Sequence, residues 1–261
     1  MTLNELDKYF NSFLKKENFP NDVSLNGIQI QNSAPALKEI KKVAFAVDAS
    51  EETALKAAKC GADVLFCHHG LFWGQCETIT ENVYKRISAF LKNDLALIAY
   101  HIPLDANKPY GNNWGLAARA GLTKTKMFGE WRGMTIGVYG QLKTKLTAEK
   151  LAEKILLPGE KPFAVLNFGK KDIKTVGIIS GGASEDVRHA VDLGLDAFVT
   201  GEFCHELFHY AKESKINVIA GGHYQTETVG LSKIICTCCG HCIILNFLTL
   251  YCCPFYILVC I

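Results

Sequence analysis

The hydrophobic positions of this chain fall into short apolar runs that alternate with segments of helical spacing. The runs Lys42–Val47, Asp63–Cys67 and Leu95–Tyr100 are rich in aliphatic and β-branched residues and predict strands. Two helices are expected between them, one after the capping residue Ser50 and one over Glu81–Lys92. Strands that alternate with helices in this way indicate βαβ units and a mostly parallel sheet.

The same pattern predicts an opening amphipathic helix and a second α/β unit that starts near Met127. The opening helix has Thr2 as its cap and Glu5 three residues later. The later elements are strands near Met134–Tyr139, Pro162–Phe168, Val176–Ile179, Ala197–Thr200 and Asn217–Ala220, and helices after Thr147, after Ser184 and over His205–Ser214. The strand that ends at Ala220 could complete this second unit or rejoin the first sheet. We expect the chain from residue 216 to return to the first unit, which gives domains of 1–126 with 216–235 and of 127–215. No internal repeat is recognised.

Composition narrows the functional class only slightly. The 261 residues carry a formal charge of +2, and the absence of a basic block argues against a nucleic-acid surface. The N-terminus lacks the layout of a signal peptide. Before Lys233 the cysteines are few and scattered, which predicts reduced thiols and a cytoplasmic protein.

Histidines and carboxylates gather where three predicted strands end. The segment Asp63–Gly70 closes with the pair His68-His69, and the segments His101–Asp105 and His223–Glu227 each pair a histidine with an acid four residues later. Ligands of parallel α/β sheets sit outside the carboxyl ends of the strands. Three such ends with imidazole and carboxylate groups predict one metal cleft assembled from distant parts of the chain.

The spacing within these segments favours two ions. Successive residues of a strand point to opposite faces, so at a strand end His68 and His69 can serve different ions. Asp105 could bridge ions about 3.5–4 Å apart. His223 and Glu227 share a face if they lie on a helix, and both could bind one ion. This mixed set suits Zn, Fe, Mn, Co or Ni better than Ca, and it does not choose among them.

Each element of the cleft also has a purely structural interpretation. A lone histidine at a strand end is most often a hydrogen-bonded polar residue, and Asp105 after Pro103 could form a turn. A rival cluster, His205 and His209 with Glu202 nearby, is better explained as a solvated helix surface. The turn Ser180–Ser184 could hold an anion, but it lacks a phosphate-loop lysine and is better explained as a tight turn.

The ordered set of motifs resembles the GTP cyclohydrolase 1 type 2 homolog family, whose members carry a dinuclear metal site. The matching stretches cover roughly residues 1 to 233 and are Asn26–Gln29, His68–Gly70, His101–Ala106, Thr200–Glu202 and Gly222–Glu227. The resemblance implies that two ions are held by His68, His69, Asp105, His223 and Glu227. It makes His101 a further ligand, or a residue that orients one, and places Thr200–Glu202 near the metals.

The resemblance also implies two α/β domains, a ring-shaped homohexamer and a small-molecule substrate, with GTP as a candidate. A metal-dependent hydrolase would open the guanine ring, and His101 would be the catalytic residue that carries the proton. Two alternatives stay open. One is a hydrolase of phosphoesters or cyclic amides, and the other is a metal-dependent scaffold or binding protein without catalysis.

The C-terminal segment departs from the rest of the chain, because residues 234–261 contain no Asp, Glu, Lys or Arg. The segment Ile243–Ile261 is long enough for a membrane anchor, although it contains Pro254 and lacks flanking basic residues. The cysteines of Cys236–Cys242 could bind zinc, although their spacing matches no standard motif. We favour a third interpretation, in which residues 236–261 are an anomalous tail that replaces the native coding sequence.

Overall fold

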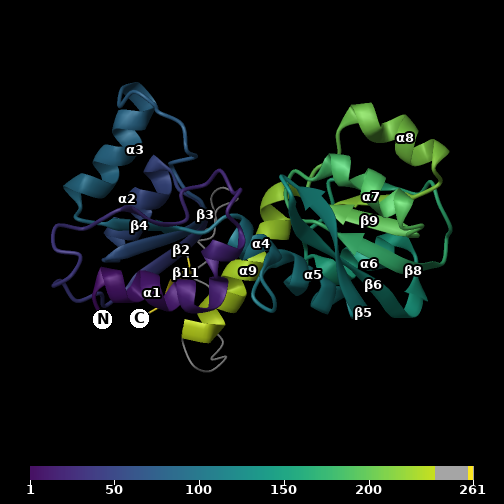
Figure 1. Ribbon diagram of the computed structural model, residues 1–261, viewed down its shortest axis with the longest axis horizontal. Helices are drawn as coiled ribbons and strands as arrows, with labels where there is room; N and C mark the ends of the chain where they lie inside the picture. The colour runs from purple at the N-terminus through teal and green to yellow at the C-terminus, as the bar shows by residue number, and fades with distance from the viewer. Residues whose placement is uncertain (239–257, 261) are drawn as a thin grey trace. The chain divides into compact units, whose positions relative to one another are not determined.

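The computed structural model describes residues 1–238 and 258–260, and the chain forms two compact units (Figure 1). Unit 1 comprises Met1–Leu104 and Leu231–Ile261, and unit 2 comprises Asp105–Gly230. Each unit is an α/β structure with a mixed sheet, as the alternation of strands and helices predicts. The chain passes between the units inside α4 (Ile102–Ala106) and inside α9 (His223–Cys238).

Unit 1 is built on a five-stranded sheet with the order β1-β4-β3-β2-β11. The strands are β1 (Gly27–Ile30), β2 (Val43–Asp48), β3 (Val64–His69), β4 (Ala96–Ala99) and β11 (Leu258–Cys260). The central strands β2, β3 and β4 are parallel, and the two outer strands are antiparallel to their neighbours. The carboxyl ends of β2, β3 and β4 therefore lie along one edge of the sheet.

The helices of unit 1 are α1 (Leu3–Leu14), α2 (Glu51–Lys59) and α3 (Glu81–Lys92), with a 3-10 turn at η1 (Lys16–Asn18). The expected capping box of α1 is present, because Thr2 and Glu5 exchange side-chain to backbone hydrogen bonds. The apolar face of α1 is buried, and the Phe10 ring packs on Phe66 of β3 with centroids 4.6 Å apart. This packing fixes α1 against the strand that carries the histidine pair.

Unit 2 is built on a six-stranded sheet with the order β5-β6-β8-β9-β10-β7. The strands are β5 (Leu122–Trp131), β6 (Met134–Leu146), β7 (Ala164–Leu166), β8 (Ile173–Ile178), β9 (Ala197–Thr200) and β10 (Asn217–Ala220). The helices are α5 (Asn112–Ala120), α6 (Ala148–Ile155), η2 (Ser184–Asp186), α7 (Val187–Asp192), η3 (His205–Leu207) and α8 (Phe208–Glu213). Strands β8, β9 and β10 are parallel, so their carboxyl ends also share one edge.

The strand that ends at Ala220 belongs to the second sheet and does not rejoin the first. It pairs in parallel with β9 (Val218 opposite Phe198) and antiparallel with β7 (Val218 opposite Leu166). All four of its residues are buried, and these two neighbours satisfy its backbone on both sides. Residues 105–126 also pack with unit 2, where Leu116 of α5 contributes to the core.

The two units contain the same core motif. In unit 1 the order β2-α2-β3-α3-β4 gives three adjacent parallel strands, and β1 is antiparallel beside the last of them. In unit 2 the order β8-α7-β9-α8-β10 does the same, and β7 is antiparallel beside β10. The pattern of residues along the chain does not reveal this repeat.

Local details of the repeat also correspond. Asp63 precedes β3 and Asp196 precedes β9, and each carboxylate accepts two backbone N–H groups at the start of the neighbouring strand. Asp94 precedes β4 and Lys215 precedes β10, and both adopt positive φ angles, 47° and 54°. The first pair of positions keeps its residue type, whereas the second keeps only its backbone geometry and changes from an acid to a base, so residue types alone do not reveal the repeat.

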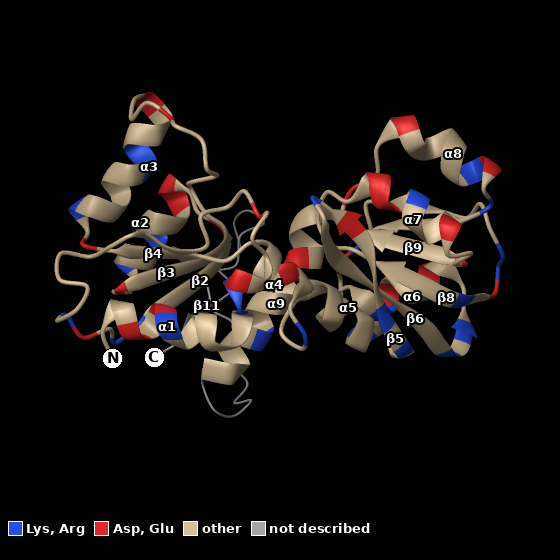
Figure 2. Cartoon of the chain, in the orientation of Figure 1, with Lys and Arg blue, Asp and Glu red and all other residues tan. Residues whose placement is uncertain are grey.

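The C-terminal segment is described only in part. The last helix, α9, ends at Cys238, and β11 pairs antiparallel with β2, with Leu258 opposite Phe45. Most of the Cys236–Cys242 motif and of the segment 243–261 lies outside the described residues. Among the described residues, no helix is both long and apolar enough to cross a bilayer. Acidic and basic residues occur in both units (Figure 2).

Candidate metal centre

Three imidazoles meet at the carboxyl edge of the first sheet. His68 and His69 end β3, and His101 follows β4, whose Ala99 is paired with Cys67. The ring centroids of His68 and His69 are 4.5 Å apart, and those of His68 and His101 are 5.3 Å apart. One potential ligand nitrogen of each ring lies within 4.8 Å of the others, so this trio could hold a metal ion.

An oxygen atom fixes the orientation of each ring in the β3 pair. The Nδ1 atom of His68 lies 3.1 Å from the Tyr100 carbonyl oxygen, and Nδ1 of His69 lies 2.8 Å from Oδ1 of Asp48. An acceptor at Nδ1 holds the proton there and directs the lone pair of Nε2 away from it. This is the arrangement in which a neutral histidine is ready to bind a metal through Nε2.

Asp22 fixes the third ring. Its Oδ1 lies 2.9 Å from Nδ1 of His101, and its Oδ2 accepts hydrogen bonds from the backbone N–H of Ile102 and from Asn26 Nδ2. Burial raises the pKa of the Asp22 carboxyl, but the hydrogen bond and charge of His101 and the contact with Asn26 outweigh it and lower the pKa. Asp22 is therefore a charged carboxylate directly beside the His101 ring.

The Asn26–Gln29 segment positions the backbone around these histidines. Asn26 Oδ1 accepts the backbone N–H of His101 at 2.7 Å, and Gln29 Oε1 accepts the N–H groups of Leu71 and Phe72. The Gln29 side chain fills the space where a Cβ at Gly70 would stand, which explains why a glycine follows the histidine pair. This motif of the sequence thus supports the site without supplying a ligand itself.

A second cluster lies at the carboxyl edge of the second sheet. His223 begins α9 directly after β10, and its ring stands between two carboxylates. Nδ1 lies 2.7 Å from Oε1 of Glu202, and Nε2 lies 3.1 Å from Oε1 of Glu227. The hydrogen bond with Glu227, together with the charges of Glu227 and Glu202, outweighs burial and raises the pKa of His223 to about 9.

Asp105 is the remaining predicted ligand, and it lies in unit 2. Its Oδ1 accepts hydrogen bonds from Asn112 Nδ2 at 2.9 Å and from the Ser180 hydroxyl at 2.8 Å. Ser180 opens the turn that the sequence analysis considered as an anion site. The turn instead orients Asp105 and brings Gly181 close to the Glu227 carboxylate, which a Cβ at Gly181 would overlap.

The model of Duf34/NIF3 (NGG1p interacting factor 3) matches residues 1–238.

The chain belongs to the Duf34/NIF3 family.

Proteins similar to this chain include several called GTP cyclohydrolase 1 type 2 homolog. The chain is 42% identical to the one from Treponema pallidum (strain Nichols), over 90% of this chain and 93% of the relative. It is 38% identical to the one from Archaeoglobus fulgidus, over 90% and 92%. Among solved structures, TTHA1606 from Thermus thermophilus is 34% identical and superposes with a TM-score of 0.79, over 91% of this chain and 93% of that one.

The side chains of the two clusters in this Duf34/NIF3 chain are of the types that bind metal ions. Imidazole and carboxylate donors suit first-row transition ions and zinc. The first cluster also supplies the acceptors that a metal-binding histidine requires at its second nitrogen. The rival histidines do not form such a set: among the described residues, no group of three potential ligands includes His205 or His209.

Sequence analysis did not single out two carboxylates that shape the site, Asp22 and Asp48. Asp48 ends β2 opposite His69 in the parallel register, so a prediction of strand pairing would have found it. Asp22 lies in the segment between α1 and β1 and contacts His101, which is 79 positions later in the chain. No local sequence pattern predicts this contact. Glu202 was noted as a neighbour of the metals and of the rival histidines, whereas it accepts the hydrogen bond of His223 Nδ1.

Proposed function

We propose that this chain is a metal-dependent hydrolase that holds two divalent ions. The ligands are His68 and His69 from unit 1 and Asp105, His223 and Glu227 from unit 2. The observation that carries the proposal is the oxygen acceptor at Nδ1 of His68, of His69 and of His101, because it prepares Nε2 for a metal. Membership of the Duf34/NIF3 family supports it further.

The chain connection between the two ligand sets also supports the proposal. Asp105 follows His101 by four residues, and a chain of that length spans at most about 14 Å. Glu227 lies on the same helix, α9, that continues into unit 1 after Gly230. Both covalent connections between the units thus begin next to proposed ligands.

The residues of this chain have distinct tasks in the proposed reaction. Bound divalent ions would supply Lewis-acid catalysis and lower the pKa of water. Asp22 orients the His101 ring beside the ligand histidines, and we assign the transfer of the proton to His101. Asp48 and Glu202 orient His69 and His223, and Ser180 orients Asp105.

The candidate reaction is the hydrolytic opening of the guanine ring of GTP, suggested by the name of the relatives. One water adds to C8 of the ring and a C8–N bond breaks, with a proton delivered to the departing nitrogen. A second water then releases C8 as formate. The proposed assembly is a homohexamer in the cytoplasm.

Formate release from GTP tests the proposal. We expect formate from protein loaded with a divalent ion, and its loss in His68→Ala. His205→Ala is the matched control, because His205 lies in η3 and belongs to no ligand group among the described residues. Formate no higher than in the metal-free control would contradict GTP ring opening. Two bound ions without turnover of GTP, phosphoesters or cyclic amides would instead favour a metal-dependent scaffold.

A further inference from the structure

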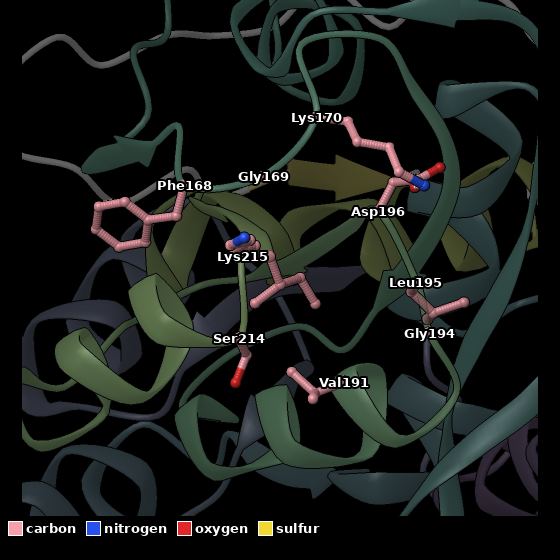
Figure 3. A pocket seen from close by; sticks show the side chains of 10 residues that line it. Phe168, Gly169, Lys170, Val191, Gly194, Leu195, Asp196, Ser214 and Lys215 are labelled. Atoms are coloured by element: carbon pink, nitrogen blue, oxygen red, sulfur yellow. Dashed lines mark hydrogen bonds and ion pairs between the residues drawn. The ribbon is translucent and has the colours of Figure 1, made fainter.

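Unit 2 contains a cavity of about 500 Å³ at the amino ends of β9 and β10 (Figure 3). Its lining includes Asp196, which precedes β9, and Lys215 and Ile216, which precede β10. His223 and Glu202 follow the carboxyl ends of the same two strands, so the cavity lies at the other edge of the sheet from the metal ligands of unit 2. Cavities of this volume commonly bind small molecules.

The wall of the cavity is apolar over a large part. Val191 of α7 and the side chains of Leu195 and Ile216 contribute aliphatic surface. Phe168 adds an aromatic ring, which is held in place by edge-to-face contact with Phe208, with ring centroids 5.0 Å apart. Such a surface favours the apolar body of a ligand.

The charges around the cavity do not balance. Lys170 Nζ donates to Asp196 Oδ1 at 2.8 Å, so these two groups neutralise each other (Figure 3). The other oxygen of Asp196 accepts the backbone N–H groups of Lys174 and Thr175. Among the described residues, no acceptor or acidic partner contacts the Lys215 ammonium group. One positive charge is thus left at the apolar cavity.

The corresponding position of the repeat in unit 1 carries a neutralised charge. In unit 1 the residue that precedes β4 is Asp94, which has the same positive φ as Lys215. Asp94 accepts hydrogen bonds from Lys38 and Ser33 and is therefore neutralised within the unit. Unit 2 has the opposite charge at this position, and Lys170, which pairs with Asp196 as Lys38 lies beside Asp63, cannot neutralise it. The group that would complete it is an acid.

We propose that this cavity binds a small organic acid with an apolar body. Its carboxylate pairs with Lys215, and its hydrocarbon part lies against Val191, Leu195 and Ile216. The site is separate from the metal ligands and does not depend on the proposed hydrolase activity.

Calorimetric titration of the full-length protein with octanoate tests this site, with 1-octanol as the uncharged control. We expect saturable binding of octanoate and weaker binding of 1-octanol. Lys215→Glu should weaken octanoate binding about tenfold or more, because it places a negative charge next to the carboxylate. The matched control is Lys212→Glu, which makes the same change of charge on α8 at a residue outside the cavity lining.

A second variant tests the apolar wall. Val191→Trp should fill the cavity and abolish octanoate binding, while the metal content and the thermal unfolding temperature report on folding. Absence of saturable binding to the wild-type protein would overturn the proposal. Equal affinity of wild type and Lys215→Glu, or full affinity of a folded Val191→Trp protein, would overturn it as well.

Discussion

The Oδ1 atom of Asp48 lies 2.8 Å from Nδ1 of His69, and the two residues face each other at the ends of adjacent parallel strands. The sheet register therefore determines which nitrogen of His69 is directed to a metal. Asp22 does the same for His101 from a loop, and the carbonyl of Tyr100 does so for His68. A strand-end side chain, a loop side chain and a backbone carbonyl thus each place an oxygen at Nδ1 of one of the three imidazoles.

Replacement of Asp48 by Asn should weaken metal binding without unfolding the protein. Asn retains an oxygen acceptor but loses the negative charge beside Nδ1 of the His69 ring. We expect a loss of about 10–100-fold in metal affinity, measured by competition with a chelator. Asp172→Asn, at an exposed aspartate, is the matched control and should leave the affinity unchanged. Equal affinities of the two variants would contradict the role of Asp48.

The metal-free protein should show an unusually basic His223. Its pKa is raised from 6.5 to about 9 by Glu227 and Glu202, so the ring is charged at neutral pH. The stabilisation by the charged ring is complete below the unfolded pKa and is lost as the pH rises through about 9. Proton NMR titration should show this pKa fall in Glu227→Gln. An unchanged pKa in that variant would exclude Glu227 as its main cause.

Alanine substitutions at Gly181 and Gly194 distinguish the energetic cost of backbone strain from the cost of a clash with the Glu227 side chain. Both have positive φ, 67° and 63°, but a Cβ at Gly181 would overlap Glu227, whereas a Cβ at Gly194 meets no atom within 4 Å. Gly194→Ala should cost about 1–2 kcal/mol of unfolding free energy from strain alone. Gly181→Ala should cost more and also reduce metal affinity. Chemical denaturation and metal titration of both variants measure the two effects.

Acid should destabilise unit 2 through Asp196. Burial raises the pKa of this carboxyl, but hydrogen bonds from Lys170 and from the backbone of Thr175 and Lys174 outweigh it and lower the pKa. A lowered folded pKa contributes stability above the unfolded value, and this contribution is lost as the pH falls through the folded pKa. Asp196→Asn should therefore show a smaller loss of unfolding free energy than wild type between neutral pH and pH about 3. A loss as large as that of wild type would contradict this role.

The sequence predicted the bounds of helices and strands better than it predicted which strands pair in a sheet. The helix expected over Glu81–Lys92 has those bounds in the structure, and the strand expected over Asp63–Cys67 appears as Val64–His69. Periodicity and capping are local properties, so the sequence reveals them directly. The placement of Asn217–Ala220 was wrong, because the choice between two sheets depends on pairing with β9 and β7, which the strand's own residues do not specify.

The residues of the site were also predictable where a local pattern marks them and not where a distant contact defines them. Its histidines and acids were identified from their positions after apolar runs and from the family resemblance. Asp22 and Asp48 act through contacts with residues 79 and 21 positions away, and such contacts leave no mark in the local pattern. The repeat was missed for a related reason, because its corresponding positions preserve backbone angles and hydrogen bonds while Asp94 is replaced by Lys215.

The most direct test of the central claim is the metal content of the purified protein, measured by elemental analysis together with the protein concentration. The proposal predicts about two divalent ions per chain, and fewer in His68→Ala and in Glu227→Gln, with His205→Ala unchanged. A wild-type chain that binds one ion or none when loaded with Zn, Fe, Mn, Co or Ni would contradict the dinuclear centre.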